Sequence, residues 1–332
     1  MQEYRALRVH RDANDQFSLQ VETVPASTLP DNDILVRVHY SDLNYKDALS
    51  TIGNPGVSRN FPHTPGIDAA GEVITDRTGQ YGPGDRVLIS GYDFGMNSPG
   101  GLAEYCSVPL QWVCPCPPQL DLREAMIYGT AGLTAAMSFD KLALHQHKAI
   151  RDTRLLVTGA SGGVGSLATA MAAKLGFQVT AMSGKTQSHD WLRRLGAVKV
   201  ISSEKWLSAS AKPLLAPQWD CAIDTLGADA LFNIIKATEQ NGAVVACGLA
   251  SGAQFNATVY PFILRGVALL GVDSAEQSND YKHKLWLRLA TDLKPSALKS
   301  MYQELTLEQV PSVLSKMREG RSRGRYVVRI GV

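Results

Sequence analysis

The first third of the chain contains short stretches in which apolar and polar residues alternate. In "DILVRVHY" (33–40) every second residue from Ile34 to Val38 is apolar, as in a strand with one buried face. Similar stretches bounded by Gly or Pro recur up to about Met126: "YRALRVHR", "GEVITD", "GDRVLIS", "GLAEYCSVP" and "WVCPCP". Short alternating strands between turn residues predict an antiparallel, barrel-like β-domain.

The pattern changes from Arg154 onward, where strand-like and helix-like runs take turns. The apolar runs "RLLVTG", "FQVTAM", "WDCAID" and "AVVACG" are separated by segments with helical spacing, such as "GGVGSLATAMAAKLG" and "ADALFNIIKATEQNG". Strands that alternate with helices of about 10–15 residues are typical of a parallel sheet built from β-α-β units. This part of the chain is therefore predicted to be a doubly wound nucleotide-binding domain.

The end of the chain returns to a strand pattern. After "PFILRGVALLGVDS" comes a polar helical stretch and then a closing run, "GRYVVRIGV", which we expect to rejoin the β-domain. The predicted fold class is α/β, with a discontinuous β-domain at residues 1–125 and 275–332 and a nucleotide-binding domain at residues 126–274.

Composition narrows the class of protein. The 332 residues are 45% hydrophobic and 19% charged with a net charge of +2, which is ordinary for a soluble globular protein and gives no reason to expect a nucleic-acid partner. No apolar run approaches the roughly 18 residues of a membrane span, and the N-terminal segment lacks signal-peptide character. We expect a cytoplasmic protein without membrane contact, in which the five cysteines are reduced. A basic cluster near the end, "REGRSRGRYVVR", is either a solvated loop or a site for an anionic ligand.

A glycine-rich turn stands between a strand-like and a helix-like run at residues 160–165, "ASGGVG". Gly162 leaves space for a pyrophosphate, the helix that begins near Gly163 points its amides at that anion, and Gly165 lets helix and strand pack closely. We predict that these residues bind a dinucleotide: Ser161, Gly162, Gly163, Val164 and Gly165.

The end of the next strand predicts which nicotinamide is used. About 18 residues beyond Gly165, where NAD-specific enzymes carry an acid for the ribose 2′-hydroxyl, the chain has Ser183, Gly184 and Lys185. An acid would repel a 2′-phosphate, whereas a serine, a backbone amide and a lysine attract it. The predicted cofactor is NADPH; the alternative is that Lys185 is an ordinary solvated lysine.

Many segments, in order over nearly the whole chain, together resemble one superfamily. They are "DLNYKDAL" (42–49), "RNFPHTPGIDAAGEV" (59–73), "GGLAEYCSVP" (100–109), "GTAGLTA" (129–135), "VTGASGGVG" (157–165), "AIDTLG" (222–227), "PFILRGVALLGVDS" (261–274) and "GRYVV" (324–328). With them the chain resembles the zinc-free, quinone-reductase-like section of the medium-chain dehydrogenase/reductases, and within it the YhdH/YhfP-type quinone oxidoreductases, the branch of bacterial NADPH-dependent acrylyl-CoA reductases. The resemblance implies a GroES-like β-barrel domain, a Rossmann domain, and a homodimer formed through the edge strand around residues 267–273.

The resemblance also bears on a possible metal. "HTPGIDAAGEV" contains a histidine and two carboxylates, including His63 and Asp68. Zinc enzymes of this superfamily use a cysteine at about the position of Leu43 or Asn44 and a histidine at that of Ile67. A catalytic zinc needs three protein donors, and these side chains cannot serve, so we expect no metal.

The resemblance further implies roles for individual residues. Tyr45 is expected beside the nicotinamide, where it donates a proton or positions the acyl group, and Asn44 is expected to bond the cofactor ribose. Asp47 and Asp68 are expected to line the same cleft and to order water or Tyr45. Two alternatives stay open: Tyr45 only packs on the nicotinamide ring, or Asp47 caps a helix. Further implied cofactor contacts are Leu249, Ile263, Ser274 and Arg325.

The function expected from these features is metal-free reduction of the C=C bond of a 2-enoyl-CoA, foremost acrylyl-CoA to propanoyl-CoA. Donors aimed at the thioester oxygen can activate such a substrate without prior deprotonation. The first alternative is reduction of quinones or free α,β-unsaturated carbonyls, and the second is a non-catalytic NADPH-binding protein. A CoA substrate predicts basic residues at the mouth of the cleft, with Lys46, Arg59 and Arg265 as candidates.

Overall fold

The computed structural model describes residues 1–331, and in it the chain divides into two compact units. The first unit consists of Met1–Thr130, Ser274–Ala290 and the chain from Leu298 onward, and the second of Ala131–Asp273 and Thr291–Ala297. Within the described part of the chain, no helix has the length and apolar character that crossing a bilayer requires.

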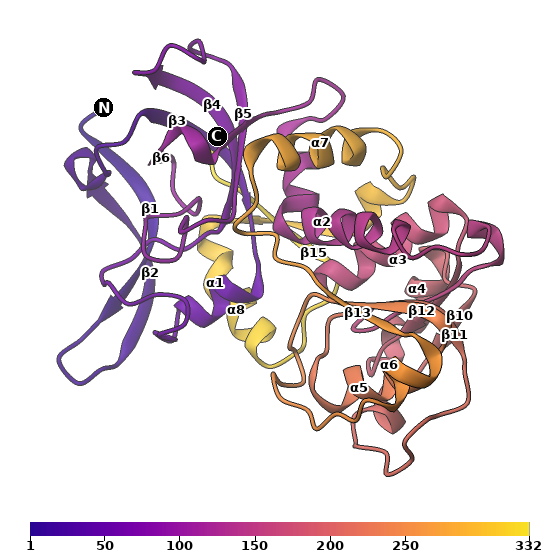
Figure 1. Cartoon of the computed structure of the whole chain (residues 1–332). Helices are drawn as coiled ribbons and strands as arrows, with labels where there is room; N and C mark the ends of the chain where they lie inside the picture. The colour runs from indigo at the N-terminus through magenta and orange to yellow at the C-terminus, as the bar shows by residue number, and fades with distance from the viewer. Residues whose placement is uncertain (332) are drawn as a thin grey trace. The chain divides into compact units, whose positions relative to one another are not determined.

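The first unit is built on antiparallel strands (Figure 1). Two form a ribbon, β1 (Glu3–Arg11) and β2 (Phe17–Pro25), and the others form a seven-stranded sheet in the order β14-β15-β3-β4-β5-β7 with β6 also paired to β3. These strands are β3 (Ile34–Asp42), β4 (Asp68–Asp76), β5 (Arg86–Ser90), β6 (Tyr105–Val108), β7 (Val113–Pro115), β14 (Tyr302–Thr306) and β15 (Arg325–Arg329). The closing strand β15 joins the sheet of this unit, as the sequence predicts, and does so by pairing with β3; the strand β14, which lies parallel to β15, was not expected.

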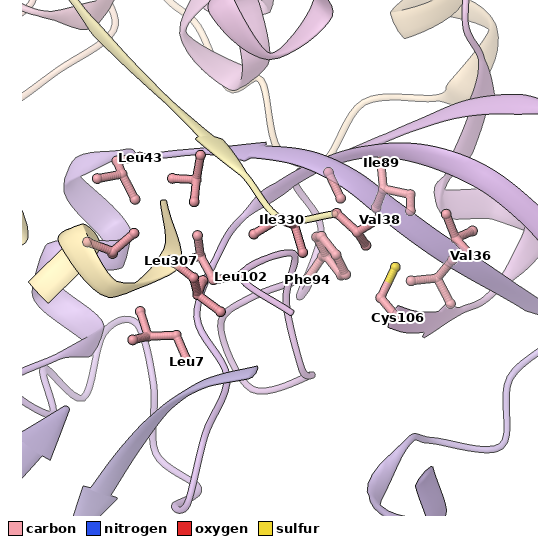
Figure 2. Packing of buried hydrophobic residues seen from close by; sticks show 14 of the residues in the cluster. Leu7, Val36, Val38, Leu43, Ile89, Phe94, Leu102, Cys106, Leu307 and Ile330 are labelled. Carbon is pink, nitrogen blue, oxygen red and sulfur yellow. The ribbon is translucent and has the colours of Figure 1, made fainter. Parts of the chain in front are cut away.

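The alternation of apolar residues explains the core of this unit. Val36 and Val38 of β3 point inward together with Ile89 of β5 and Cys106 of β6, and Figure 2 shows them packed in one cluster. Leu307 and Ile330, from the C-terminal part of the chain, complete the same cluster. Burial in apolar surroundings raises the pKa of the Cys106 thiol to about 12, which keeps it an inert core residue.

The first unit contains the helices α1 (Tyr45–Ser50), α7 (Asn279–Ala290) and α8 (Val310–Arg318). The first residues of α2 (Leu122–Ala143), up to Thr130, also belong to it. Gly129 interrupts α2 with φ 49° and ψ −153°, a backbone conformation that residues with a Cβ rarely adopt. The chain therefore changes direction at Gly129, one residue before the first unit ends at Thr130.

The second unit is a parallel six-stranded sheet in the order β10-β9-β8-β11-β12-β13. Its strands are β8 (Arg154–Val157), β9 (Gln178–Met182), β10 (Lys199–Ile201), β11 (Trp219–Asp224), β12 (Thr238–Ala246) and β13 (Ala268–Gly271). Its other helices are α3 (Gly163–Leu175), α4 (His189–Arg194), α5 (Ala228–Lys236) and α6 (Tyr260–Arg265). Numbered within the sheet, the strand order is 3-2-1-4-5-6, the doubly wound Rossmann order, so the predicted fold class is confirmed.

Candidate active site

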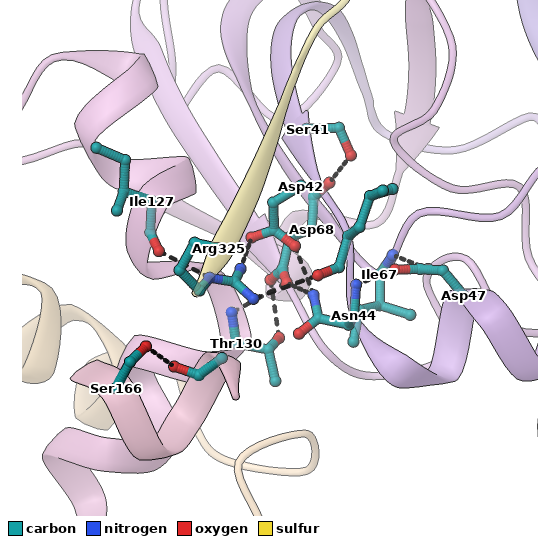
Figure 3. A network of polar contacts seen from close by, with 12 residues as sticks. Ser41, Asp42, Asn44, Asp47, Ile67, Asp68, Ile127, Thr130, Ser166 and Arg325 are labelled. Carbon is teal, nitrogen blue, oxygen red and sulfur yellow. Dashed lines mark hydrogen bonds and ion pairs between the residues drawn. The ribbon is translucent and has the colours of Figure 1, made fainter. Parts of the chain in front are cut away.

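The cluster of polar groups in the first unit begins where β3 ends and α1 starts (Figure 3). Asn44 is the N-cap of α1, and its backbone N–H donates to Oδ2 of Asp47 at 2.7 Å. Oδ1 of Asp47 accepts from the backbone N–H groups of Gly66, at 2.9 Å, and Ile67, at 3.1 Å. One carboxylate thus caps the helix and anchors the segment "PGID" beside it.

Asp47 is fully buried, and this corrects its predicted place on the wall of the cleft. The three N–H donors favour the charged carboxylate, but the cost of burial outweighs them and raises the pKa of Asp47 to about 7. The alternative interpretation from the sequence, that Asp47 caps a helix, is the one that the structure supports.

Asp68, the first residue of β4, is also fully buried. Its Oδ2 accepts from Nδ2 of Asn44 at 2.8 Å and from the backbone N–H of Thr130 at 2.9 Å, and its Oδ1 accepts from the Thr130 hydroxyl at 2.8 Å. A carboxylate with three donors is held in one orientation. Asp68 therefore orients Asn44 and Thr130, and among residues 1–331 its bonds lead to these two residues and not to Tyr45, which the sequence analysis also considered.

Arg325 lies inside the first unit, with 2% of its surface exposed. Its Nη2 is 2.7 Å from Oδ2 of the buried Asp42, its Nε donates to the carbonyl of Ile127 at 2.9 Å, and its Nη1 donates to the carbonyl of Leu43 at 3.3 Å. The guanidinium is thus used to join β15, β3 and α2. This corrects the predicted contact of Arg325 with the cofactor, because a guanidinium that is 2% exposed and bonded on several sides has little surface left for a ligand.

The amide of Asn44 is fixed by two buried carboxylates. Nδ2 donates to Oδ1 of Asp42 at 2.5 Å and to Oδ2 of Asp68 at 2.8 Å (Figure 3). Both N–H hydrogens of the amide are therefore used, and towards a ligand the side chain can only accept a hydrogen bond. This arrangement suits the predicted bond from a ribose hydroxyl to Asn44.

Gly129 makes space for the two carboxylates. A Cβ built on this residue would lie 1.8 Å from Oδ2 of Asp42 and 3.0 Å from Oδ2 of Asp68. The break in α2 and the close approach of Asp42 thus both depend on glycine. Burial and the neighbouring Asp68 and Asp47 raise the pKa of Asp42, while the nearby Arg325 lowers it, and burial is the larger effect.

Tyr45 differs from the buried acids. It is the first residue of α1 and its side chain is 52% exposed. Its hydroxyl makes no hydrogen bond to any residue from 1 to 331. Of the three residues predicted to be catalytic, Tyr45 is the one available to touch a ligand.

Sequence reasoning missed Asp42, Gly129 and Thr130 as members of this cluster. All three lie in segments that carried the family resemblance, "DLNYKDAL" and "GTAGLTA". The available signal was that an acid at the end of a buried strand, and polar groups in an apolar helix such as Thr130 beside Gly129, are costly unless they have a partner.

His63, the other metal candidate, is buried with Nε2 3.0 Å from the carbonyl of Gly95. Burial lowers the pKa of His63 to about 4, so the ring is neutral at pH 7. Its hydrogen bond is to Gly95, while Asp68 bonds Asn44 and Thr130. Among residues 1–331 no three His, Cys, Asp or Glu side chains form a group able to hold a metal ion.

In the second unit the glycine-rich turn joins β8 to α3. Gly162 is the N-cap of this 13-residue helix, which begins at Gly163. A Cβ on Gly165 would lie 2.4 Å from the carbonyl oxygen of Gly159, so close packing of the turn requires glycine there. Ser161 is buried, whereas Gly162, Gly163 and Val164 are partly exposed at the start of the helix. Free amides at such an N-terminus fit a pyrophosphate.

The loop after β9 lies against this turn. The hydroxyl of Ser183 donates to the hydroxyl of Ser161 at 3.0 Å and accepts from the backbone N–H of Lys185 at 3.1 Å. A Cβ on Gly184 would lie 3.0 Å from Oγ of Ser203, so Gly184 also sits in a tight place. Partial burial lowers the pKa of Lys185 from its ordinary value. The structure thus brings the predicted 2′-phosphate residues next to the predicted pyrophosphate residues.

The remaining residues predicted to contact the cofactor or CoA lie outside these two groups. Leu249, after β12, is 64% exposed and Ile263, on α6, is 69% exposed, so both are accessible surfaces of the second unit. Ser274 is the first residue of the segment that returns to the first unit. Arg265 donates to the carbonyls of Leu215, Lys236 and Thr238, which removes it from the candidates for a CoA phosphate.

The sequence matches two family models, the alcohol dehydrogenase GroES-like domain over residues 30–118 and the zinc-binding dehydrogenase over residues 163–290. It is 41% identical over 312 residues to a probable acrylyl-CoA reductase, AcuI, of Escherichia coli, covering 93% of this chain and 95% of that one. It is 39% identical over 328 residues to a putative quinone oxidoreductase, YhfP, of Bacillus subtilis, covering 98% and 99%.

Two solved structures have nearly the same fold. Escherichia coli YhdH with bound NADPH superposes with a TM-score of 0.94 at 40% identity, over 98% of this chain and 100% of that one. Bacillus subtilis YhfP with bound NAD superposes with a TM-score of 0.95 at 39% identity, over 99% and 100%. The chain therefore belongs to the medium-chain dehydrogenase/reductase family, in the quinone-oxidoreductase-type branch that contains YhfP, YhdH and the acrylyl-CoA reductase AcuI.

Proposed function

We propose that the protein is an NADPH-dependent oxidoreductase that reduces the C=C bond of a 2-enoyl-CoA, with acrylyl-CoA to propanoyl-CoA as the main reaction. The observation that carries this proposal is the pairing of one exposed phenol, Tyr45, with acids that are buried and already bonded to the protein. The phenol is an accessible proton donor, whereas these acids are not available as an exposed base. Reduction of an activated C=C bond needs a proton donor, whereas oxidation of an alcohol needs a base.

The cofactor is proposed to be NADPH. The N-terminus of α3, with Gly162 and Gly163, is suited to the pyrophosphate, and Ser183 with Lys185 is suited to the 2′-phosphate. YhfP has been solved with NAD and YhdH with NADPH, so the preference for the 2′-phosphate is assigned to Ser183 and Lys185 of this chain. When bound, NADPH supplies the hydride.

The residues of the first unit would act on the substrate. Addition of hydride to the β-carbon breaks the π bond and leaves an enolate whose charge lies on the thioester oxygen. The Tyr45 hydroxyl donates a proton to the α-carbon, and the exposed tyrosinate regains a proton from solvent. Asn44, with its amide oriented by Asp42 and Asp68, accepts a hydrogen bond from the cofactor ribose.

Two other functions remain as alternatives. YhfP is named a putative quinone oxidoreductase, which supports reduction of quinones or free α,β-unsaturated carbonyls by the same kind of hydride transfer. A non-catalytic NADPH-binding protein would keep the glycine-rich turn and would not need an exposed Tyr45.

The test is steady-state oxidation of NADPH with acrylyl-CoA, crotonyl-CoA and a simple benzoquinone, measured side by side. We expect the highest kcat/KM for acrylyl-CoA. A kcat/KM for the quinone well above that for acrylyl-CoA would contradict the proposal in favour of the first alternative. Binding of NADPH without turnover of any of the three would favour the second.

The reaction is proposed to be metal-free, because Asn44 and Ile67 stand where relatives that use zinc have ligands, and neither can serve as one. Stoichiometric zinc in the purified protein would contradict this. We also propose a cytoplasmic protein that forms a homodimer through β13, the last strand of the six-stranded sheet, where Leu269 is 39% exposed. A monomer in light scattering at micromolar concentration would contradict the dimer.

A further inference from the structure

The C-terminal part of the first unit carries a concentrated positive charge. The segment Lys316–Arg323, "KMREGRSR", has four basic residues and one acidic residue, a formal net charge of +3. The whole chain has a net charge of only +2, so the rest of the molecule is slightly negative. All five charged side chains of this basic segment are exposed.

Helix geometry explains only part of this charge. Lys316 and Arg318 lie in the last turn of α8, where a cation is stabilised by the helix dipole. Arg321 and Arg323 lie beyond the end of the helix, outside the reach of that effect. Arg321 forms an ion pair with Glu319 of the same segment, which leaves the segment with an excess of positive charge.

The basic segment lies close to the exposed tyrosine. Helices α8 and α1 pack against each other in the first unit (Figure 1). Nη1 of Arg318 donates to the hydroxyl of Thr51 at 3.4 Å, and Thr51 is the C-cap of α1. Tyr45 is at the other end of this six-residue helix, which is about 9 Å long at 1.5 Å per residue.

We propose that the basic segment binds the phosphate groups of the nucleotide half of CoA, so that the pantetheine arm follows α1 towards Tyr45. This inference rests on the proposed function. Exposed arginine and lysine side chains are the usual partners of phosphate groups, and the net charge of +3 on the basic segment suits a ligand that carries several negative charges. Ile52, which is 46% exposed and directly follows Thr51, offers an apolar contact for the arm.

The test compares two double variants with equal loss of charge. Lys316→Gln with Arg321→Gln changes the basic segment, while Lys212→Gln with Lys284→Gln removes two exposed lysines elsewhere. For the first variant we expect KM for acrylyl-CoA to rise about fivefold, as is typical for the loss of two exposed ionic contacts, with kcat unchanged. KM for acrylyl-N-acetylcysteamine, which has the same acyl group but no nucleotide, and KM for NADPH stay the same. The second variant behaves like the wild type.

Ionic strength gives an independent readout. Because exposed charges are screened by salt, KM of the wild type for acrylyl-CoA rises between low and physiological ionic strength, and it rises less in the Lys316→Gln, Arg321→Gln variant. The inference is overturned if KM for acrylyl-CoA is unchanged in that variant. It is equally overturned if KM for acrylyl-N-acetylcysteamine rises as much, or if only KM for NADPH rises, since the segment would then serve the cofactor.

Failure of the proposed reaction can be told apart from failure of this inference. If the wild type does not reduce acrylyl-CoA, its dissociation constant for CoA itself is measured by calorimetry. Weaker binding of CoA by the Lys316→Gln, Arg321→Gln variant than by the control variant still supports the inference. Equal binding by the two variants, or no binding of CoA to the wild type, overturns it.

Discussion

Replacing Gly129 by alanine tests whether the buried polar cluster has the arrangement described. The added Cβ would lie 1.8 Å from Oδ2 of Asp42, far inside van der Waals contact, so Asp42 has to move. That movement disturbs its ion pair with Arg325 and its hydrogen bond from Asn44. The substituted residue also has to keep φ near 49°, which a side chain with a Cβ tolerates poorly.

The expected loss of stability follows from these two effects. Positive φ costs about 1 kcal/mol for an L-residue, and breaking a buried ion pair costs about 3 kcal/mol or more. A total of about 4 kcal/mol corresponds to a fall in Tm of about 8–16 °C for a domain of this size. Gly79 provides the matched control, because its φ is 76° and no atom lies within 4 Å of a Cβ built there. Gly79→Ala should lower Tm by only about 2–4 °C.

The assay is thermal unfolding followed by circular dichroism, with both variants measured at the same protein concentration. Gly129→Ala should unfold at a temperature well below that of Gly79→Ala. If the two variants unfold within about 2 °C of each other, the close approach of Gly129 and Asp42 is wrong. If kcat of Gly129→Ala also falls, the orientation of Asn44 depends on its hydrogen bond to Asp42.

Three further predictions concern single side chains. Tyr45→Phe should lower kcat with acrylyl-CoA by about 100-fold or more, the usual contribution of a general acid, and an unchanged kcat would leave Tyr45 with a packing role. Lys185→Ala should raise KM for NADPH about tenfold through loss of one charge-assisted contact, while KM for NADH stays constant; equal effects on both would show that Lys185 does not bind the 2′-phosphate. Burial lowers the pKa of His63 to about 4. Below about pH 6.5 His63 is therefore protonated in the unfolded chain but stays neutral in the folded protein. The free energy of unfolding should fall by up to about 3 kcal/mol as the pH is lowered from about 6.5 to about 4. The fall in Tm over that interval should be smaller in His63→Gln than in the partly exposed control His145→Gln, and equal falls would contradict a neutral His63.

The sequence predicts the Rossmann unit well because each of its elements has a local signal. The spacing of "GGVGSLATAMAAKLG" predicts a helix, and the helix α3 begins at Gly163 and ends at Leu175. The turn before it can be recognised because glycines are required within a few residues of one another. Contacts between residues that are close in sequence can therefore be predicted from sequence patterns.

The buried polar cluster around Asp42 and Asp68 could not be predicted in the same way. Asp42 and Arg325 are separated by nearly the whole chain, and their pairing depends on β15 lying beside β3. In "REGRSRGRYVVR" Arg325 looks like one more surface cation. The alternation of β15 places Arg325 on the same face as the buried Val327, and that was the one local signal of its burial. The Gly-Thr pair in α2 was a signal of an unusual position, but the break itself could not be predicted, because a glycine does not reveal its φ.

The proposed reaction delivers hydride to the β-carbon of an enoyl thioester and a proton to its α-carbon. The most direct measurement uses acrylyl-CoA with NADPH that carries deuterium at the transferred C4 position, and locates the label in propanoyl-CoA by NMR. The proposal predicts one deuterium at the β-carbon, and one at the α-carbon when unlabelled NADPH is used in D₂O. Label from NADPH at the α-carbon, or no propanoyl-CoA while a quinone is reduced, would contradict it.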